Sequence, residues 1–549
     1  LSYLQPGDLE AGNARIDEAA ANAGRDPSEI VRLLNVSGRE SADQLTDLAV
    51  GAGASTFIIG GDDPGLAERF AAETMPAVRA AVAAERARTG TDAHTARRSA
   101  KALSLRRPGI AYDDLPASLR ESAVEPGDFA YRTAHSTYLR GGKPGLVLRP
   151  GTIDEVSDAV RFAARHPDLP LGVRSGGHGI SGRSTNDGGL VIDVGALNEI
   201  EVVDPSRRLV RIGPGARWGE VAHVLEPHGW AISSGDSGSV GVGGLATAGG
   251  IGFLSRSQGL TIDRLRAADV VLADGSRVHV SADENPELFW AIRGAGASIG
   301  IVVSFEFAAA PVGEIGHVQL AFDASDTAGF LRGFADAMAA SPRDVTLFAV
   351  LAPGRGGQPP IAHVYGVVDS DDPDTIIARL QPFAQVAPLV GQQVTLTTYA
   401  SAVAHTPGAE YGGQGEPHFR SGLIGDLDEA AAAALAELIT SGASPWLQLR
   451  AVGGAVADVP TADTAYAHRG ATFAVTAVGA SARFDALWND LSTHFEGMYL
   501  SFETRTGADI VAQAFPPETL ARLREIKRRV DPTARFGDNF PVDPQPTIA

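Results

Sequence analysis

The 549-residue sequence contains no cysteine. Disulfide bonds, thiolate metal sites and a cysteine nucleophile are therefore excluded. Lysine is scarce too: Lys101, Lys143 and Lys527 are the only lysines among 46 basic residues. No run of about 20 apolar residues occurs, so we expect no membrane span.

Positive charge is in deficit, because 66 acidic residues outnumber the basic ones and leave a net charge of −20. This balance opposes binding to nucleic acid or to an anionic membrane, since both require a basic surface. The first residues show no basic segment followed by an apolar one, so we expect no signal peptide. Together with the lack of cysteine, these features predict a cytoplasmic protein. The remaining composition, 44% hydrophobic and 20% charged, is typical of a globular chain.

The chain is long enough for about two to four domains, and its patterning changes along its length. Residues 1–90 alternate helical and short strand patterns, and the polar, basic residues 91–110 are typical of a linker. Short strands with brief connections follow over 111–311, and long strands mixed with helices over 312–498. Residues 499–549 contain a basic helix that stops before Pro532. We expect an α+β fold with a small N-terminal α/β fragment.

A histidine surrounded by glycines stands directly after an apparent strand, in the run VRSGGHGI at 173–180. Bare backbone on both sides of His178 is compatible with a turn residue, a metal ligand, a base or a point of covalent attachment. The run alone does not choose among these roles.

A second glycine-rich run, GDSGSVGVGGLATAGGIG at 235–252, has glycine at eight of 18 positions. Backbone of this kind adopts positive φ or approaches a ligand closely. Such a run between ordered elements suits a phosphate or a flat ring laid against main-chain N–H groups. A flexible linker is the alternative, but valine and isoleucine alternate with the glycines. The run also matches the dinucleotide pattern G-x-G-x-x-A loosely, but further glycines stand where its helix would begin.

Taken in order, several motifs resemble one family. They are RSGGH (174–178), the V-G-x-G-G run (240–252), DGSRV (274–278) and LFWAIRGAG (288–296). They are similar to the p-cresol methylhydroxylase-type FAD domain of the vanillyl-alcohol oxidase superfamily, in its berberine bridge enzyme-like branch. The resemblance covers about 111–549. It implies an FAD-binding domain at 111–311, joined by a returning segment at 499–549, and a substrate domain at 312–498 with an antiparallel sheet covered by helices.

The resemblance also implies how FAD is held. The histidine after R-S-G-G carries FAD through its 8α-methyl carbon, with noncovalent FAD as the alternative. Ser237 stands where many relatives have a second, cysteine link, so a single link through His178 is expected. The expected cofactor-binding residues are Arg174, Ser175, Gly176, Gly177, His178, Gly179, Gly235, Ser237, Val240, Gly241, Gly243, Gly244, Gly250, Gly252, Ile301 and Asn539. No metal site is expected.

For catalysis, the resemblance makes Tyr499, in the segment YLSF, the first candidate base. A free tyrosine has a pKa near 10, so a neighbouring positive charge or hydrogen-bond donor must stabilise its phenolate, and we expect Arg469 or Arg505 in that role. A packing or FAD-orienting role is the alternative for Tyr499. The other candidate bases are Tyr399, Tyr411 and His418, whereas a structural role is expected for His468.

In such oxidases a small residue beside the flavin leaves room for dioxygen, and Val240 stands at that position. The resemblance therefore implies an oxidase that passes hydride from a hydroxyl-bearing sugar or secondary metabolite to FAD, and then electrons to dioxygen. The expected partners are this small molecule and dioxygen. The alternatives are a dehydrogenase with another acceptor, and a silent flavin-binding or assembly protein.

Residues 1–90 resemble the C-terminal end of luciferase-like monooxygenases. Those proteins are TIM barrels of about 250–300 residues. A last βα portion cannot close a barrel, so we expect a remnant that packs on the oxidase or mediates assembly. We assign it no catalysis.

Overall fold

The computed structural model describes residues 8–27, 30–60, 63–89, 100–128, 130–354, 356–404, 413 and 415–545. The chain divides into two compact units, residues 1–105 and 106–549, and each is described by itself. In the described part of the chain, no helix combines the length and the apolar character needed to cross a bilayer.

The first unit is a small α/β fragment, as expected. Strands β1 (Leu33–Val36) and β2 (Thr56–Ile59) pair in parallel, and α2 (Ala42–Val50) connects them. The hydroxyl of Ser41 accepts a hydrogen bond from the amide of Gln44 and caps α2. Helices α1 (Asp8–Asn22), α3 (Pro64–Arg69) and α4 (Met75–Thr89) complete the unit. Its core contains Val36, Leu45, Phe70 and Val78.

The second unit begins inside the stretch predicted as a linker. Residues 91–99 of that stretch lie outside the described residues, and Ala100–Leu103 form the short helix α5. Arg106 then forms an ion pair with the buried carboxylate of Glu125, and Ile110 is buried. Residues 106–110 therefore pack as part of the second unit.

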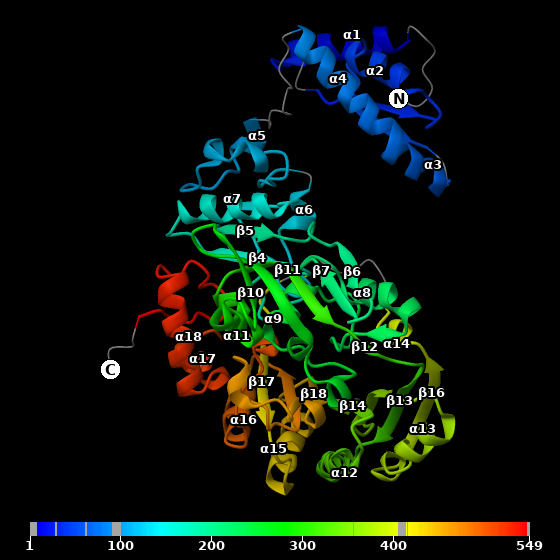
Figure 1. Cartoon of the computed structure of the whole chain (residues 1–549), viewed down its shortest axis with the longest axis vertical. Helices are drawn as coiled ribbons and strands as arrows, with labels where there is room; N and C mark the ends of the chain where they lie inside the picture. The colour runs from blue at the N-terminus through cyan, green and yellow to red at the C-terminus, as the bar shows by residue number, and fades with distance from the viewer. Residues whose placement is uncertain are drawn as a thin grey trace. The chain divides into compact units, whose positions relative to one another are not determined.

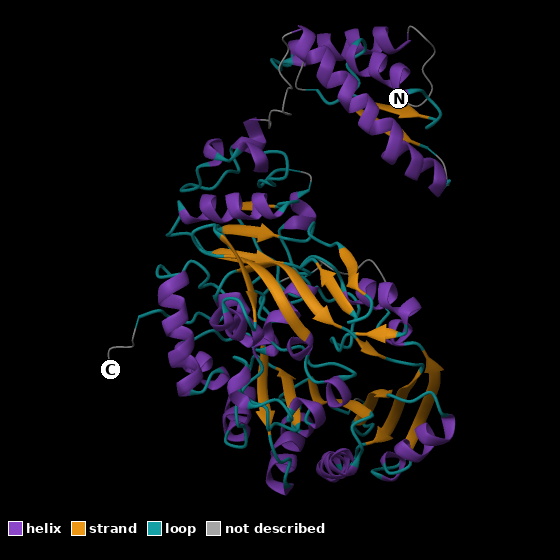
Figure 2. Ribbon diagram, in the orientation of Figure 1, coloured by secondary structure: helices purple, strands orange, loops and turns teal. Residues whose placement is uncertain are grey.

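Two sheets form the first half of this unit. Strands β3 (Leu146–Leu148), β5 (Leu190–Asp193) and β4 (Leu171–Arg174) are parallel, and helix α7 (Ile153–Ala164) lies along them (Figures 1 and 2). Their continuous apolar runs are typical of strands covered on both faces. The second sheet is antiparallel, in the order β10 (Arg277–Ser281), β9 (Leu265–Val271), β11 (Ile301–Ala308), β7 (Leu209–Ile212) and β6 (Ile200–Asp204).

A seven-stranded antiparallel sheet forms the other half. Its order is β16 (Leu389–Thr397), β13 (Ile315–Asp323), β15 (Ile361–Val368), β14 (Val345–Ala352), β18 (Trp446–Ala451), β19 (Phe473–Val478) and β17 (Phe419–Ile424). One face is covered by α12 (Thr327–Ala340), α13 (Pro373–Leu380), α15 (Glu429–Thr440) and α16 (Ala482–Ser492) (Figure 1). The expected α+β fold, with an antiparallel sheet covered by helices, is confirmed.

The C-terminal segment returns to the first half of the unit. Helices α17 (Ala508–Ala514) and α18 (Pro517–Val530) lie beside α11 (Pro286–Ala295), and residues of all three share one core (Figure 1). The buried ammonium of Lys527 pairs with Asp531 and donates to the carbonyl oxygens of Ser298 and Phe536 at 2.6 and 2.9 Å. This lysine joins α18 to the loop after α11 and to the chain that follows α18.

Candidate active site

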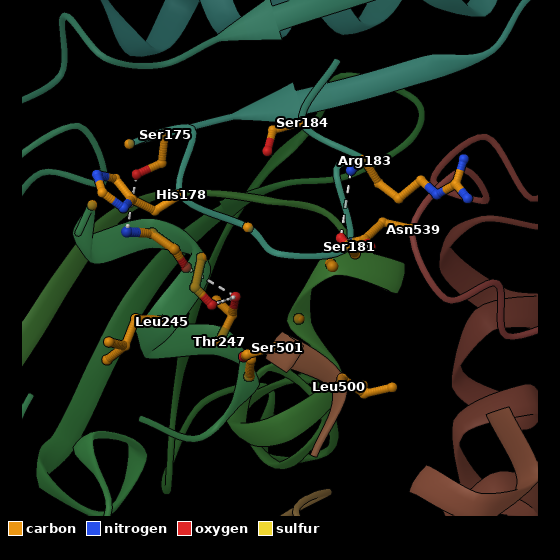
Figure 3. A pocket seen from close by; sticks show the side chains of 18 of the residues that line it. Ser175, His178, Ser181, Arg183, Ser184, Leu245, Thr247, Leu500, Ser501 and Asn539 are labelled. Atoms are coloured by element: carbon orange, nitrogen blue, oxygen red, sulfur yellow. Dashed lines mark hydrogen bonds between the residues drawn. The ribbon is translucent and has the colours of Figure 1, made fainter. Parts of the chain in front are cut away.

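A cavity of about 420 Å³ lies where these elements meet. Its lining comes from the loop after β4, the glycine-rich run, the loop after α11, the segment 499–502 and residues 536–540. Arg450 adds a contribution from β18 of the seven-stranded sheet. Figure 3 shows His178 and Ser175 above the helix that carries Leu245 and Thr247, α9 (Val242–Ala248), with Asn539 toward the other side of the view.

The two glycine-rich segments touch backbone to backbone. A Cβ on Gly176 would lie 2.4 Å from the amide nitrogen of Gly241, and a Cβ on Gly241 would lie 2.3 Å from that of Gly176. The guanidinium of Arg217 joins the same segments by donating to the carbonyl oxygens of Gly176 and Ser239, each at 2.7 Å. Glycine at 176 and 241 is therefore required by this close approach, which brings the surroundings of His178 and Val240 into one cavity.

All five residues Ser175–Gly179 line the cavity. The hydroxyl of Ser175 donates to the carbonyl of Pro214 at 2.6 Å and accepts from the amide of Gly243 at 3.3 Å. The ring of His178 stacks on that of Tyr138, with centroids 4.8 Å apart and planes inclined by 19°. A side chain that bears a cofactor needs an ordered position of this kind.

Arg174 corrects the sequence-based expectation. Its guanidinium forms an ion pair with Asp193 at 2.7 Å and donates to the carbonyl of Ala134 at 2.7 Å. It is buried and does not line the cavity. Arg174 therefore anchors the end of β4, so its place in the motif has a structural explanation.

The second run divides into two groups. Of the residues of this run that were expected to bind the cofactor, those that line the cavity are Gly235, Ser237, Val240, Gly241, Gly243 and Gly244. Gly250 and Gly252 do not line the cavity, contrary to expectation. Gly250 has a φ of +87° and donates its N–H to the phenol oxygen of Tyr499, and a Cβ on Gly252 would lie 1.4 Å from the carbonyl oxygen of Ser234. These two glycines allow the chain to turn behind the cavity.

Tyr499 is buried and lines the cavity. Its phenol oxygen accepts the hydrogen bond from the amide of Gly250 at 3.0 Å, and its ring packs against Tyr466 and Phe502. Arg469 and Arg505 are engaged elsewhere. The Arg469 guanidinium holds Asp263 through two contacts of 2.9 Å, and the Arg505 guanidinium holds Glu503.

The cation that faces Tyr499 is Arg450, a residue that the motifs did not single out. Arg450 lines the cavity and interacts electrostatically with Tyr499. Burial opposes its charge, but the carboxylate of Asp236 beside it keeps the pKa of Arg450 above its ordinary value. The sequence feature that could have indicated Arg450 is its position in WLQLRA, where a charged residue interrupts an otherwise largely apolar strand, β18.

Two of the other candidate bases, Tyr399 and His418, are not among the residues that line the cavity. The hydroxyl of Tyr399 forms a 2.8 Å hydrogen bond with Ser234 in a fully buried position. His418 is exposed just before β17, and Tyr411 lies outside the described residues. His468 lies within 3.1 Å of the carbonyl oxygens of Gln513 and Ala514 through Nε2.

The end of the cavity near the C-terminal segment holds Ile301 and Asn539, both predicted, and the charged pair Arg183 and Asp538, which were not. The hydroxyl of Ser181 donates to Oδ1 of Asn539 at 3.1 Å. Burial raises the pKa of Asp538, although the charge of Arg183 opposes this rise. Only the folded chain brings the loop after β4 and the C-terminal segment together.

The lining fits an FAD. A long cavity with glycine backbone along one wall accepts a pyrophosphate and a flat ring without side-chain obstruction, and Gly176 and Gly241 leave no room for a Cβ. Because the chain contains no cysteine, a thioether to the flavin is impossible and a histidine link is the covalent route left at this site. Among the described residues, no group of three or more His, Asp or Glu side chains is arranged to hold a metal ion.

Comparison with known proteins agrees with this lining. A family model for an FAD binding domain matches residues 144–281. The chain is 30% identical over 447 residues to a chitooligosaccharide oxidase of Gibberella zeae, which covers 73% of this chain and 88% of that protein. It is 28% identical over 461 residues to (R)-6-hydroxynicotine oxidase of Paenarthrobacter nicotinovorans, which covers 78% of this chain and 98% of that protein.

Solved structures show the same fold. The chain is similar to 6-hydroxy-D-nicotine oxidase from Arthrobacter nicotinovorans with a TM-score of 0.68 and 26% identity, over 79% of this chain and 100% of that one. It is similar to a chitooligosaccharide oxidase with a TM-score of 0.68 and 25% identity, over 78% of this chain and 99% of that one.

Proposed function

Because the chain belongs to the berberine bridge enzyme-like family of FAD-linked oxidases, we propose that it oxidises a hydroxyl-bearing small molecule, a sugar or a secondary metabolite, and reduces dioxygen to hydrogen peroxide. The observation that carries this proposal is the shared cavity of His178 and Tyr499. Relatives named as oxidases of chitooligosaccharide and of 6-hydroxynicotine support it. FAD, when bound, supplies the hydride-accepting and oxygen-reducing chemistry.

The cofactor would be held by a single covalent link through His178, with its 8α-methyl carbon as the point of attachment. The glycine backbone at 176–179 and 241–244 would hold the pyrophosphate and one side of the ring, and Ile301 and Asn539 would contact the far end. Stacking on Tyr138 supports this role, because it fixes the imidazole plane. Ser237 stands at the position of a second link and cannot form one.

Tyr499 would take the proton of the substrate hydroxyl at its phenol oxygen. The N–H of Gly250 donates to this oxygen, and Arg450, which also lines the cavity, interacts electrostatically with Tyr499. A hydrogen-bond donor and a cation would stabilise the negative charge that develops on this oxygen as the proton of the substrate is transferred. Burial of the ring excludes water from the oxygen that accepts the proton.

Val240 would leave room for dioxygen. It lies in the cavity lining between Ser239 and Gly241, and its side chain is one methylene smaller than leucine. In a close-packed wall a single methylene decides whether a small molecule fits.

For residues 1–90 we propose a remnant of a luciferase-like monooxygenase without catalysis of its own. Strands β1 and β2 and helix α2 form a parallel βαβ unit, the unit that TIM barrels repeat. The relatives described above are matched over 73–78% of this chain, and the family model begins at residue 144.

The test is the visible spectrum of the purified protein, titrated with sugars and other alcohols without oxygen and then with air. We expect the flavin to bleach with a substrate alcohol, recover in air and release one hydrogen peroxide per cycle. Bleaching without recovery in air would favour a dehydrogenase. No bleaching with any alcohol would favour a silent flavin-binding protein.

A further inference from the structure

A buried polar network joins the glycine-rich run to the seven-stranded sheet. Asp236, next to Ser237 in the run, accepts a 2.7 Å hydrogen bond from the hydroxyl of Tyr365 on β15. The same oxygen, Oδ2, lies 3.0 Å from a guanidinium nitrogen of Arg450 on β18. Gln448, also on β18, donates to Tyr365 at 2.6 Å and accepts from Arg450 at 2.9 Å.

The two oxygens of Asp236 have different surroundings. Oδ2 takes both contacts, whereas Oδ1 accepts a hydrogen bond from none of the described residues. Asp236 lines the cavity, and 17% of its side-chain surface stays exposed. A carboxylate in a cavity wall that is held through one oxygen has its second oxygen left to accept a hydrogen bond from a ligand.

Arg450 is fixed and neutralises this carboxylate. Its side chain is only 8% exposed, and the rings of Phe348 and Phe502 lie 5.1 and 4.7 Å from its guanidinium carbon. Those rings and Gln448 prevent the guanidinium from turning away from Asp236. Arg183 and Asp538, two further lining residues, have side chains of opposite formal charge.

We infer that Asp236 is a substrate-binding carboxylate, and that the Asp236–Arg450 pair makes the cavity selective for a neutral substrate that donates a hydroxyl hydrogen bond. The inference rests on the proposed function for the location of the substrate. Asp236 would be a group that recognises the substrate, separate from the proposed base Tyr499.

The charges decide the substrate class. An anionic group is repelled by Asp236 and a cationic group by Arg450, and because the pair is neutral as a whole, attraction to its other member does not repay the hydration that the ion loses. A neutral hydroxyl meets neither repulsion, and its O–H has an acceptor in Oδ1. A neutral molecule without a donor would leave that carboxylate oxygen unsatisfied, which is costly.

Three probes of one size and different charge test this inference: benzyl alcohol, benzoate and benzylammonium. Dissociation constants for the flavin-loaded protein without oxygen come from the difference spectrum of the oxidised flavin, or from saturation of bleaching if the alcohol is oxidised. We expect the wild type to bind benzyl alcohol at least tenfold more tightly than either ion.

Removing either charge of the pair should change which of the three probes gains affinity. Asp236→Asn leaves the charge of Arg450 uncompensated, so benzoate should gain at least tenfold in affinity. Arg450→Gln leaves the carboxylate alone, so benzylammonium should gain at least tenfold. Tyr365→Phe removes the hydrogen bond to Oδ2 but keeps both charges, so alcohol binding should weaken without a gain for either ion. Asp458→Asn, which removes an exposed charge paired with Arg343, is the matched control and should keep the wild-type order.

The inference is overturned if the wild type prefers an ion, if it binds none of the three probes, or if Asp236→Asn keeps the wild-type order. If Arg450→Gln fails to retain flavin, Asp236→Asn decides alone. The order of affinities does not require turnover. A protein that shows the expected order yet oxidises no alcohol would refute the proposed function and leave the inference standing.

Discussion

The amide of Gly250 donates a hydrogen bond across 3.0 Å to the phenol oxygen of Tyr499. The two residues belong to distant parts of the chain, the glycine-rich run and the segment before α17. Gly250 has a φ of +87°, a conformation that glycine adopts readily. A main-chain donor is fixed by the backbone and stays directed at the oxygen that would accept the proton of the substrate.

Replacing Tyr499 by phenylalanine should lower the rate of flavin reduction about 10²-fold or more, the usual contribution of a positioned base. Folding and FAD content should stay nearly unchanged, because only one hydroxyl is lost. Stopped-flow absorbance without oxygen measures the rate. An unchanged rate would leave Tyr499 as a packing or FAD-orienting residue, with Tyr399, Tyr411 and His418 as the next candidates.

Replacing His178 by alanine should release the flavin. In the wild type the yellow colour should stay with the acid-precipitated protein, because a covalent bond survives unfolding. In His178→Ala it should pass to the supernatant. Flavin found wholly in the wild-type supernatant would refute the covalent link and leave noncovalent FAD.

Replacing Val240 by leucine should slow reoxidation of the reduced protein by dioxygen and spare flavin reduction, because the added methylene fills space that oxygen requires. Mixing the reduced protein with oxygenated buffer in a stopped-flow instrument measures the first rate. Wild-type reoxidation that takes minutes would contradict the oxidase proposal and favour a dehydrogenase.

Gly241 and Gly244 form a matched pair, since both line the cavity and only one is in close contact with the protein. A Cβ at 241 would lie 2.3 Å from the amide nitrogen of Gly176, whereas a Cβ at 244 meets nothing within 4 Å. Gly241→Ala should lower the free energy of unfolding by about 1–3 kcal/mol, as overpacking does. Gly244→Ala lies within α9 and should raise it by up to about 1 kcal/mol. Denaturant unfolding of flavin-free protein checks both, and equal effects would show that the contact of 176 with 241 is not tight.

Deleting residues 1–100 should leave FAD binding intact. The second unit begins at Arg106 and has its own cores. The ratio of flavin to protein absorbance measures retention. A flavin-free or insoluble truncation would show that the N-terminal unit is required.

The sequence allowed prediction of the parts of the site that depend on local backbone. The glycines around His178 and Val240 stand in two contiguous runs, so their pattern could be recognised before folding. The partners of Tyr499 could not, because they depend on which side chains the sheets bring together. Arg469, one of the two expected partners, pairs with Asp263 instead, and Arg450 from strand β18 lines the cavity.

Sequence motifs can also include residues that do not line the site, as Arg174, Gly250 and Gly252 show. Each belongs to a recognisable motif, yet none lines the cavity. The motif keeps Arg174 because a buried arginine anchors β4, and the two glycines because the chain turns sharply behind Tyr499. A motif therefore locates the surroundings of a site, but it does not distinguish residues that line the cavity from residues that hold the backbone behind it.

The attachment of α18 through Lys527 bears on the order in which the protein is made. Phe536, Asp538, Asn539 and Phe540 line the cavity and follow every other lining residue in the chain, so they leave the ribosome last. The carbonyl oxygens of Ser298 and Phe536 accept hydrogen bonds from Lys527, and both residues line the cavity. The lysine therefore fixes the C-terminal part of the cavity wall to the loop after α11. A nascent chain that still lacks this segment would lack that part of the cavity wall. Lasting capture of FAD is thus expected only after these residues have been synthesised.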